Sequence, residues 1–167
     1  MENLWAPWRG KYVANVGKIK GCFLCQHLKL KDTRKSLILY KGKHSFIILN
    51  KFPYNNGHLM IVPIKHIKNL EDLGDEELNE IFLLARRIIP ILKKVYHPQG
   101  FNIGMNLGVC AGTSVAEHMH LHIVPRWEGD TNYMPVIGGT KIIPESLEES
   151  YRKIKSEIQN SWNKKSK

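Results

Sequence analysis

Several features that decide a protein's class are missing from this sequence of 167 residues. No apolar run approaches the roughly 18–20 residues that cross a membrane, and residues 1–9 lack the apolar core of a signal peptide. We therefore expect a cytoplasmic protein without a membrane partner. Internal repeats, low-complexity segments and Ser/Gly-rich linkers are also missing, which favours one domain with a C-terminal extension.

Cysteine is scarce, with only Cys22, Cys25 and Cys110. Three cysteines form no disulfide framework, and a Cys-x-x-Cys pair in an intracellular protein indicates metal or redox chemistry. Cys22 and Cys25 would supply half of a four-ligand zinc site, and a buried thiol pair is the simpler alternative. A redox pair is disfavoured because no strand-then-helix context surrounds the two residues. Cys110 is expected to be a loop residue.

Acidic residues are few: Asp and Glu number 15 against 25 Lys and Arg, which leaves a net charge of +10. Such a field attracts polyanions, although the excess could equally serve solubility. Together with the cysteine pair, the charge raises the hypothesis of a zinc-stapled nucleic-acid-binding module. The absence of a dense basic helix or of an aromatic-basic repeat argues against it. Part of the excess lies in a tail at 164–167 that we expect to fray.

Apolar periodicity predicts the secondary structure. We expect helices at 75–96 and 145–162, and strands at 36–40, 44–50, 58–62, 101–107 and 118–124. Pro90 should kink the first helix. The short connections between the first three strands and between the last two favour antiparallel pairing, and therefore the α+β class.

Three of the eight histidines, His118, His120 and His122, alternate with Met119 and Leu121. On a strand the three imidazoles share one face while the apolar residues point to the core. A neutral imidazole is a competent nucleophile near pH 7, and a second one can orient or protonate. A metal site and a run of partly exposed polar positions are the alternatives.

The loop at 108–114 precedes these histidines and contains two glycines and two adjacent hydroxyl residues. Such a loop can turn backbone N–H groups and hydroxyls toward a phosphate, although an ordinary hairpin loop would look similar. Beside three histidines, the phosphate interpretation is favoured.

Residues 118–124 resemble the His-φ-His-φ-His-φ-φ signature of the histidine triad (HIT) superfamily. Residues 50–63 resemble the family's Asn-containing loop, Gly-His pair and apolar strand, so the resemblance covers about residues 36–127. It implies a HIT-like fold: an antiparallel meander sheet with one long helix and a C-terminal helix. The domain organisation would be an arm at 1–35, a core at 36–127 and an extension at 128–167.

The resemblance also assigns roles to residues of this chain. His120 would be the nucleophile that forms a nucleotidyl-histidine intermediate, His122 would position the phosphate and leaving group, and His58 would steady the nucleophile. Ser114 would donate its hydroxyl to the phosphates. The other implied nucleotide- and phosphate-binding positions are Phe46 and Leu49 at the base, Asn50 at the ribose, and Asn106, Gly112, Thr113 and Trp127.

Some members of the family bind zinc through a Cys-x-x-Cys pair, a histidine after a Pro-x-x-His step and the first triad histidine. The resemblance therefore implies a structural zinc ion and no organic cofactor, with ligands Cys22, Cys25, His66 and His118. Such a site would pin the N-terminal arm against the catalytic strand. Because family members are usually dimers through a continuous sheet, a homodimer is expected.

Thr113 stands where dinucleoside triphosphate hydrolases have Gln. The chain is more similar to another branch, the diadenosine tetraphosphate phosphorylases, which it resembles in the segments 4–9, 112–114, 116–118, 125–130 and 137–139. The expected function is cleavage of dinucleoside polyphosphates by phosphorolysis, with a nucleotide or dinucleotide and inorganic phosphate as partners. A hydrolase of dinucleoside polyphosphates or nucleoside phosphoramidates, and a non-catalytic nucleotide-binding regulator, are the alternatives.

Overall fold

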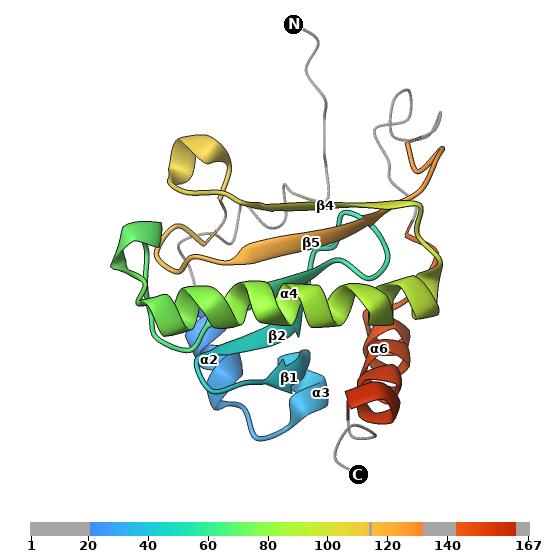
Figure 1. The fold of residues 1–167 in the computed structure, drawn as a ribbon, viewed down its shortest axis with the longest axis horizontal. Helices are drawn as coiled ribbons and strands as arrows, with labels where there is room; N and C mark the ends of the chain where they lie inside the picture. The colour runs from blue at the N-terminus through green and yellow to red at the C-terminus, as the bar shows by residue number, and fades with distance from the viewer. Residues whose placement is uncertain (1–20, 114, 132–142, 163–167) are drawn as a thin grey trace, which may run out of the picture.

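The computed structural model describes residues 21–113, 115–131 and 143–162, and every structural statement below concerns these residues (Figure 1). Ser114 lies outside the described residues. The same holds for the segments 4–9 and 137–139 and for the lysine-rich tail.

One five-stranded antiparallel sheet forms the centre of the fold, with the order β1-β2-β3-β5-β4. Its strands are β1 (Ile38–Lys41), β2 (Ser45–Leu49), β3 (Leu59–Pro63), β4 (Gly100–Met105) and β5 (Leu121–Arg126). The helices are α2 (Phe23–Lys29), α3 (Thr33–Ser36), α4 (Asp75–Tyr96) and α6 (Leu147–Trp162), with short 3₁₀ turns η1 (Leu70–Asp72) and η2 (Val109–Ala111). The predicted α+β class with an antiparallel sheet is confirmed. The last strand in the chain, β5, lies inside the sheet between β3 and β4.

Two strands begin at least two residues later than predicted. The first strand begins at Ile38 because Ser36 ends α3, whose N-terminal amides are capped by the Asp32 carboxylate, and Leu37 then turns the chain with a φ of 59°. The last strand begins only at Leu121, so His118 and His120 precede β5. The sequence analysis also missed α2, whose seven residues are too short for a clear helical period.

The two faces of the sheet have different neighbours. Sixteen buried residues from the sheet, α4 and α6 form the larger core, which includes Ile47, Ile61 and Leu121. Figure 1 shows α4 running alongside the strands on one face of the sheet, with α6 near its C-terminal part. The cross-strand register places Ile48, Met60, His122 and Gly104 in one row, one residue out of step with those core positions. Because side chains alternate along a strand, His122 faces away from α4.

The long helix α4 contributes six buried residues at helical spacing, from Ile81 to Leu92. Acidic residues in its first turn and basic residues in its last turn match the helix dipole. The helix continues through the exposed Pro90, so the predicted kink stays a prediction. Neither α4 nor any other helix in the described ranges combines the length and apolarity needed to span a bilayer.

The C-terminal helix packs into the larger core through Tyr151, Ile154 and Ile158. At its end, the Arg87 guanidinium of α4 lies 4.1 Å from the Trp162 ring and 5.8 Å from the Tyr40 ring. These cation–π contacts join α4, α6 and β1. The division of the chain into an arm, a core and an extension stays a prediction.

Glu80 of α4 holds the turn between β1 and β2. Its half-buried carboxylate accepts hydrogen bonds from the backbone N–H groups of Lys43 (2.9 Å), His44 (2.6 Å) and Ser45 (2.5 Å).

We expect Glu80→Ala to lower the free energy of unfolding by about 1–3 kcal/mol, because three amides lose their acceptor. Denaturant unfolding measures the change. Glu76→Ala is the matched control: its carboxylate, on a side chain 71% exposed, should cost under about 1 kcal/mol. Equal losses in both variants would contradict this account.

Candidate active site

A hydrogen-bond chain fixes the proton positions on His58 and His122. The backbone N–H of Tyr54 donates to His58 Nδ1 (3.1 Å), so the proton of the neutral His58 ring lies on Nε2. This Nε2–H donates to His122 Nδ1 at 2.9 Å. The proton of His122 is therefore on its own Nε2. The Tyr54 ring also stacks on His58, with centroids 4.7 Å apart.

His120 has the opposite arrangement of its protons. Its Nδ1–H donates to the backbone carbonyl of His118 at 2.9 Å, which leaves the lone pair on Nε2. The His120 and His122 rings lie edge to face, with centroids 4.7 Å apart. One histidine thus offers a bare nitrogen and its neighbour an N–H donor, which is the complementary pair that nucleophilic attack on a phosphate needs.

Burial keeps these histidines neutral. Removal from water lowers the pKa of His58 to about 3, with smaller contributions from the charges of His122 and His120. The same cause, followed by the charge of His120, lowers the pKa of His122 to about 4. Burial also lowers the pKa of His120, against the opposing effect of its bond to the His118 carbonyl. At neutral pH all three rings are therefore uncharged, and the tautomers deduced above hold.

A cavity of about 370 Å³ opens beside His122 on the face away from α4. Two strands and two loops line it, through Tyr54, Asn55, Asn102, Ile103, Gly104, Asn106, His122, Val124 and Arg126. The cavity therefore has a histidine N–H donor, several amide groups and one guanidinium in its walls. This lining suits an anionic, hydrogen-bonding ligand.

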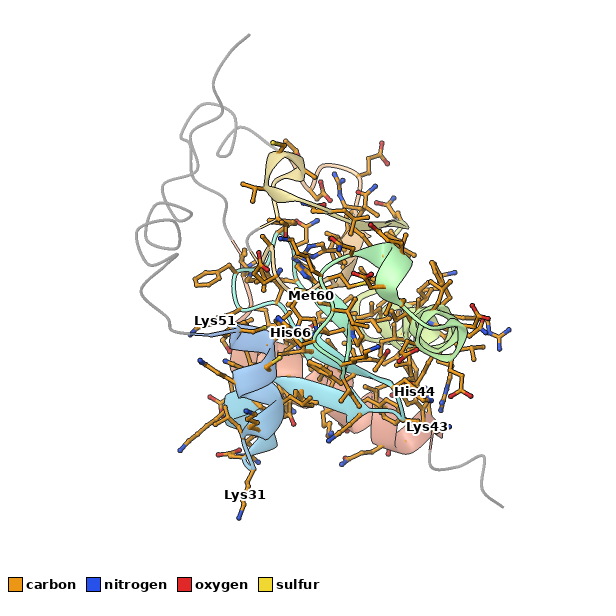
Figure 2. The ribbon with its side chains drawn as sticks, turned by 90° about the vertical axis from the view of Figure 1, so that its left-hand side faces the viewer. Lys31, Lys43, His44, Lys51, Met60 and His66 are labelled. Carbon is orange, nitrogen blue, oxygen red and sulfur yellow. The ribbon has the colours of Figure 1, made fainter. Side chains whose placement is uncertain are left out.

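The first triad histidine belongs to a different cluster. His118 Nδ1 lies 3.3 Å from Cys22 Sγ and 3.5 Å from Cys25 Sγ, and Cys25 Sγ lies 3.4 Å from His66 Nδ1. Figure 2 places His66 beside α2. The ligand atoms of all four residues lie within 4.8 Å of one another. Metal–ligand bonds of about 2.0–2.3 Å in a tetrahedron give edges of roughly 3.3–3.8 Å, and the three sulfur–nitrogen distances above fall in that range.

The orientation of His118 also fits a ligand. Its Nε2–H donates to the Pro63 carbonyl at 2.9 Å, so the Nδ1 lone pair faces the cysteines. A backbone acceptor on the second ring nitrogen is the usual support for a metal-bound histidine. The four residues implied by the resemblance thus meet in space, and two sulfur with two nitrogen donors is a set that Zn²⁺ prefers.

The structure corrects the prediction that three imidazoles line one face of one strand. His118 and His120 precede β5 and are 0% and 3% exposed, and only His122 lines the cavity. His118 turns to the cysteine cluster because the Pro63 carbonyl accepts its Nε2–H. The histidine run therefore supplies two sites.

Two positions expected at the base do not offer surface to a ligand. Leu49 belongs to the core beneath α4, and Phe46 is fully buried in the smaller cluster on the other face. Both side chains fill the interior because β2 is covered on both faces, as its five buried residues show. Trp127 also lies away from the cavity: its indole N–H donates to the Tyr96 carbonyl at 3.3 Å.

Of the other expected positions, Asn50 lies beside a histidine and Asn106 shares the cavity with His122. The Asn50 amide nitrogen is 3.4 Å from His58 Nε2, while its oxygen accepts from the Phe52 N–H at 2.9 Å. Asn106 lines the cavity and lies beside Gly112, which has a φ of +82°. The Thr113 hydroxyl accepts from the Val115 N–H at 3.3 Å.

Sequence reasoning missed the loop and strand residues that complete the cavity. These are Tyr54, Asn55, Asn102 and Arg126. Tyr54 acts on His58 through its backbone N–H, which no residue type reveals. The even-numbered spacing of Arg126 from His122 was a usable signal, because it puts both side chains on one face of β5.

Three comparisons bear on this arrangement. The HIT domain family model matches residues 31–129. An "AP-4-A phosphorylase" of Mycobacterium tuberculosis is 39% identical over 165 residues, which cover 94% of this chain and 84% of that protein. Among solved structures, a Plasmodium falciparum diadenosine triphosphate hydrolase is 29% identical with a TM-score of 0.64, covering 78% of this chain and 80% of that one. A zinc-bound histidine triad family protein from Mycobacterium smegmatis shares the fold, with 23% identity, a TM-score of 0.63 and coverages of 92% and 96%.

Fold and site together define a class of protein: an antiparallel α+β domain in which a buried His120 and a cavity-lining His122 have complementary tautomers. Within that class, the chain belongs to the HIT domain family, and it is an enzyme of that family.

The low pKa of His58 predicts how stability depends on pH. The unfolded chain takes up a proton below the ordinary pKa of 6.5, whereas folded His58 resists it until about 3. His58 therefore contributes stability that is present above pH 6.5 and is lost as the pH falls toward 3. At pH 5 the loss should be about 2 kcal/mol.

Denaturant unfolding at pH 7 and pH 5 measures this loss. His58→Gln is the control, because Gln can contact His122 but cannot take up a proton. The stability of the variant should fall less over this interval, by about the same 2 kcal/mol. Parallel pH profiles for the two proteins would rule out His58 as the source.

Proposed function

We propose that this enzyme cleaves dinucleoside polyphosphates such as diadenosine tetraphosphate through a nucleotidyl-histidine intermediate, and that inorganic phosphate takes up the nucleotidyl group. The pairing of a bare Nε2 on the buried His120 with the N–H donor of the neighbouring His122, which lines the cavity, carries this proposal. The similarity to a phosphorylase over 94% of the chain supports the choice of substrate and acceptor. The absence of Gln at position 113 favours phosphate over water as the acceptor.

In the first step, the lone pair of His120 Nε2 forms a bond to the α-phosphorus. The bond from that phosphorus to the next bridging oxygen breaks, and the polyphosphate half leaves with the electron pair. The Nδ1–H bond to the His118 carbonyl holds the ring in the attacking tautomer and stabilises the positive charge that develops on it. Positioning of this kind carries much of the rate enhancement in phosphoryl-type transfer.

His122 and the loop at 108–113 would handle the negative charge. The Nε2–H of His122 is free to donate to a phosphate or leaving-group oxygen, because its Nδ1 already accepts from His58. Gly108 and Gly112 both have a φ of +82°, which turns the loop around η2 beside Asn106. We assign phosphate contacts to this loop and to Ser114, and ribose contacts to Asn50. Each donor aimed at developing charge contributes on the order of 3 kcal/mol.

In the second step, phosphate attacks the same phosphorus from the side that the leaving group has vacated. The phosphorus–nitrogen bond breaks, and His120 recovers its lone pair. With diadenosine tetraphosphate, ATP leaves in the first step and ADP in the second, whereas water would give AMP. The Arg126 guanidinium in the cavity wall supports binding of an anionic chain at this face.

We further propose a structural zinc ion held by Cys22, Cys25, His66 and His118. With all four positions filled by protein, such an ion supplies folding energy and takes no part in the chemistry. It would join α2 to the segment that precedes His120, whose ring bonds to the carbonyl of the ligand His118.

A cytoplasmic homodimer completes the proposal. β4 is an edge strand, and no described residue pairs with its outer side, while Asn102, Ile103 and Gly104 are exposed there. An exposed strand edge is a template for pairing with a second copy.

Product analysis with diadenosine tetraphosphate tests the reaction. We expect ADP and ATP to appear only when phosphate is present, and His120→Ala to lower turnover by at least about 10³-fold. His44→Gln, in the turn between β1 and β2, is the control variant. AMP and ATP formed regardless of phosphate would show a hydrolase instead, and no turnover under either condition would favour the nucleotide-binding regulator.

The metal content of the purified protein tests the zinc site. Cys25→Ser should lose bound zinc and melt at a lower temperature, because it removes one of four ligands. Cys110→Ser is the matched control, since Cys110 is an exposed cysteine outside the cluster. Elemental analysis of all three proteins distinguishes the outcomes. Zinc absent from the parent protein, or equal in Cys25→Ser, would disprove the assignment.

A further inference from the structure

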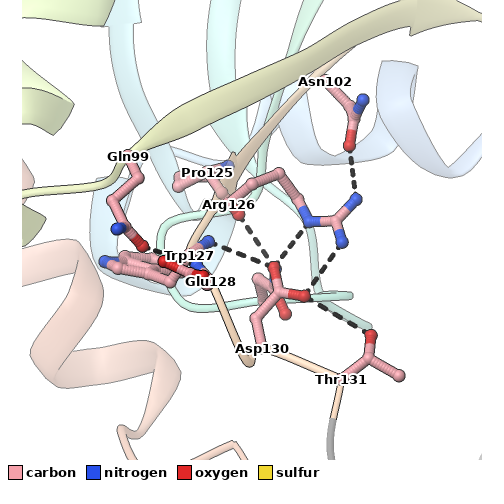
Figure 3. Close-up of polar contacts among 9 residues, drawn as sticks. Gln99, Asn102, Pro125, Arg126, Trp127, Glu128, Asp130 and Thr131 are labelled. Atoms are coloured by element: carbon pink, nitrogen blue, oxygen red, sulfur yellow. Dashed lines mark hydrogen bonds and ion pairs between the residues drawn. The ribbon is translucent and has the colours of Figure 1, made fainter.

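Asp130 follows β5 and accepts hydrogen bonds both from the end of that strand and from the loop that precedes His58 (Figure 3). It accepts from Arg126 through Nε (2.5 Å) and Nη2 (2.9 Å), and from the Trp127 N–H (3.3 Å). It also accepts from the side-chain amide of Asn55 at 2.8 Å. Chiefly through its bond to Arg126, the pKa of the Asp130 carboxyl is held well below its usual range. The group is thus a permanent acceptor.

Asn55 links Asp130 to the loop that precedes His58. It is 5% exposed, and its two amide hydrogens are both used, on Asp130 and on the Pro125 carbonyl (2.9 Å). Its backbone carbonyl accepts from the His58 N–H at 3.1 Å. Asn55 therefore fastens the loop to the end of β5 on one side and to His58 on the other.

The loop also passes close to the Tyr96 ring at Gly57. Gly57 has a φ of +74°, and a Cβ there would lie 2.7 Å from the Tyr96 ring. Next to Asn55 in the chain is Tyr54, whose N–H fixes the His58 proton on Nε2. A shift of Asn55 would move this amide away from His58 Nδ1 and would allow the other tautomer.

We propose that Asp130 is a positioning residue: by holding Asn55, it keeps the Tyr54 amide on His58 and so maintains the proton arrangement of the His58–His122 pair. The consequence for turnover rests on the proposed function. The consequence for the tautomers does not, because it concerns the protein without substrate.

The alternative is that Asp130 serves only as the ion-pair partner of Arg126, which also bonds to Asn102. Three variants separate the two roles. Asp130→Ala removes both the ion pair and the acceptor for Asn55. Arg126→Ala removes the same ion pair but leaves that acceptor in place. Asp130→Asn retains an amide oxygen that can accept from Asn55, without the charge.

Imidazole ¹⁵N chemical shifts of the ligand-free variants report the tautomer directly. We expect His58 to keep its Nε2–H form in the parent protein, in Arg126→Ala and in Asp130→Asn. Asp130→Ala should show a mixture of tautomers. In that variant kcat for the proposed substrate should fall by at least about tenfold, while KM changes less, because misplacement of catalytic groups affects the chemical step. Asp130→Asn should restore most of kcat relative to Asp130→Ala.

Two results would overturn the proposal. One is an unchanged His58 tautomer in Asp130→Ala. The other is a mixture of tautomers in Arg126→Ala that matches Asp130→Ala, because that would trace the effect to the ion pair. If no variant or parent protein turns over the dinucleotide while the tautomers change as expected, the proposed substrate fails and the positioning role stands.

Discussion

The hydrogen bond from the Tyr54 amide to His58 Nδ1 is the constraint on which the site depends. A backbone N–H can only donate, so this bond decides the proton position on His58, and the next bond decides it on His122. Without it, His122 could present a lone pair instead of a donor to the cavity. The loop at 50–58 is therefore part of the active site even where its side chains point elsewhere.

Two backbone carbonyl groups set the tautomers of His118 and His120, and these two histidines consequently belong to two different sites. The Pro63 carbonyl takes the Nε2–H of His118, and the His118 carbonyl takes the Nδ1–H of His120. Opposite nitrogens are thereby left bare: Nδ1 of His118 toward the cysteines, and Nε2 of His120 for the attack proposed above. The division is possible because β5 begins only at Leu121, which frees the two preceding histidines from strict alternation. One short segment can thus serve a Cys₂His₂ cluster and a reaction site together.

Periodicity along the sequence predicted the α+β class and the long helix, and the family resemblance implied the four residues that meet in the cysteine cluster. The placement of Phe46 and Leu49 at the base, which the resemblance implied, stays a prediction: both side chains are buried, because β2 is covered on both faces, and a five-residue strand does not reveal what packs over it. Trp127 was assigned to the phosphate pocket by resemblance, but its indole is held by the Tyr96 carbonyl. Asp130 acts through a bond to Asn55, 75 residues away in sequence, and no local pattern shows that contact.

The two hydrophobic clusters differ in size, and this difference has a dynamic consequence. The smaller cluster, which includes Leu24 of α2 and Phe46, has six buried residues. The cluster beneath α4 has sixteen. Small packing units open at lower free energy than the whole molecule, so amide hydrogens of α2 should exchange faster than those of α4. Cys22 and Cys25 would leave with that unit, whereas His66 and His118 would stay behind. Local opening of the N-terminal segment, with the sheet still folded, would therefore separate two members of this cluster from the other two.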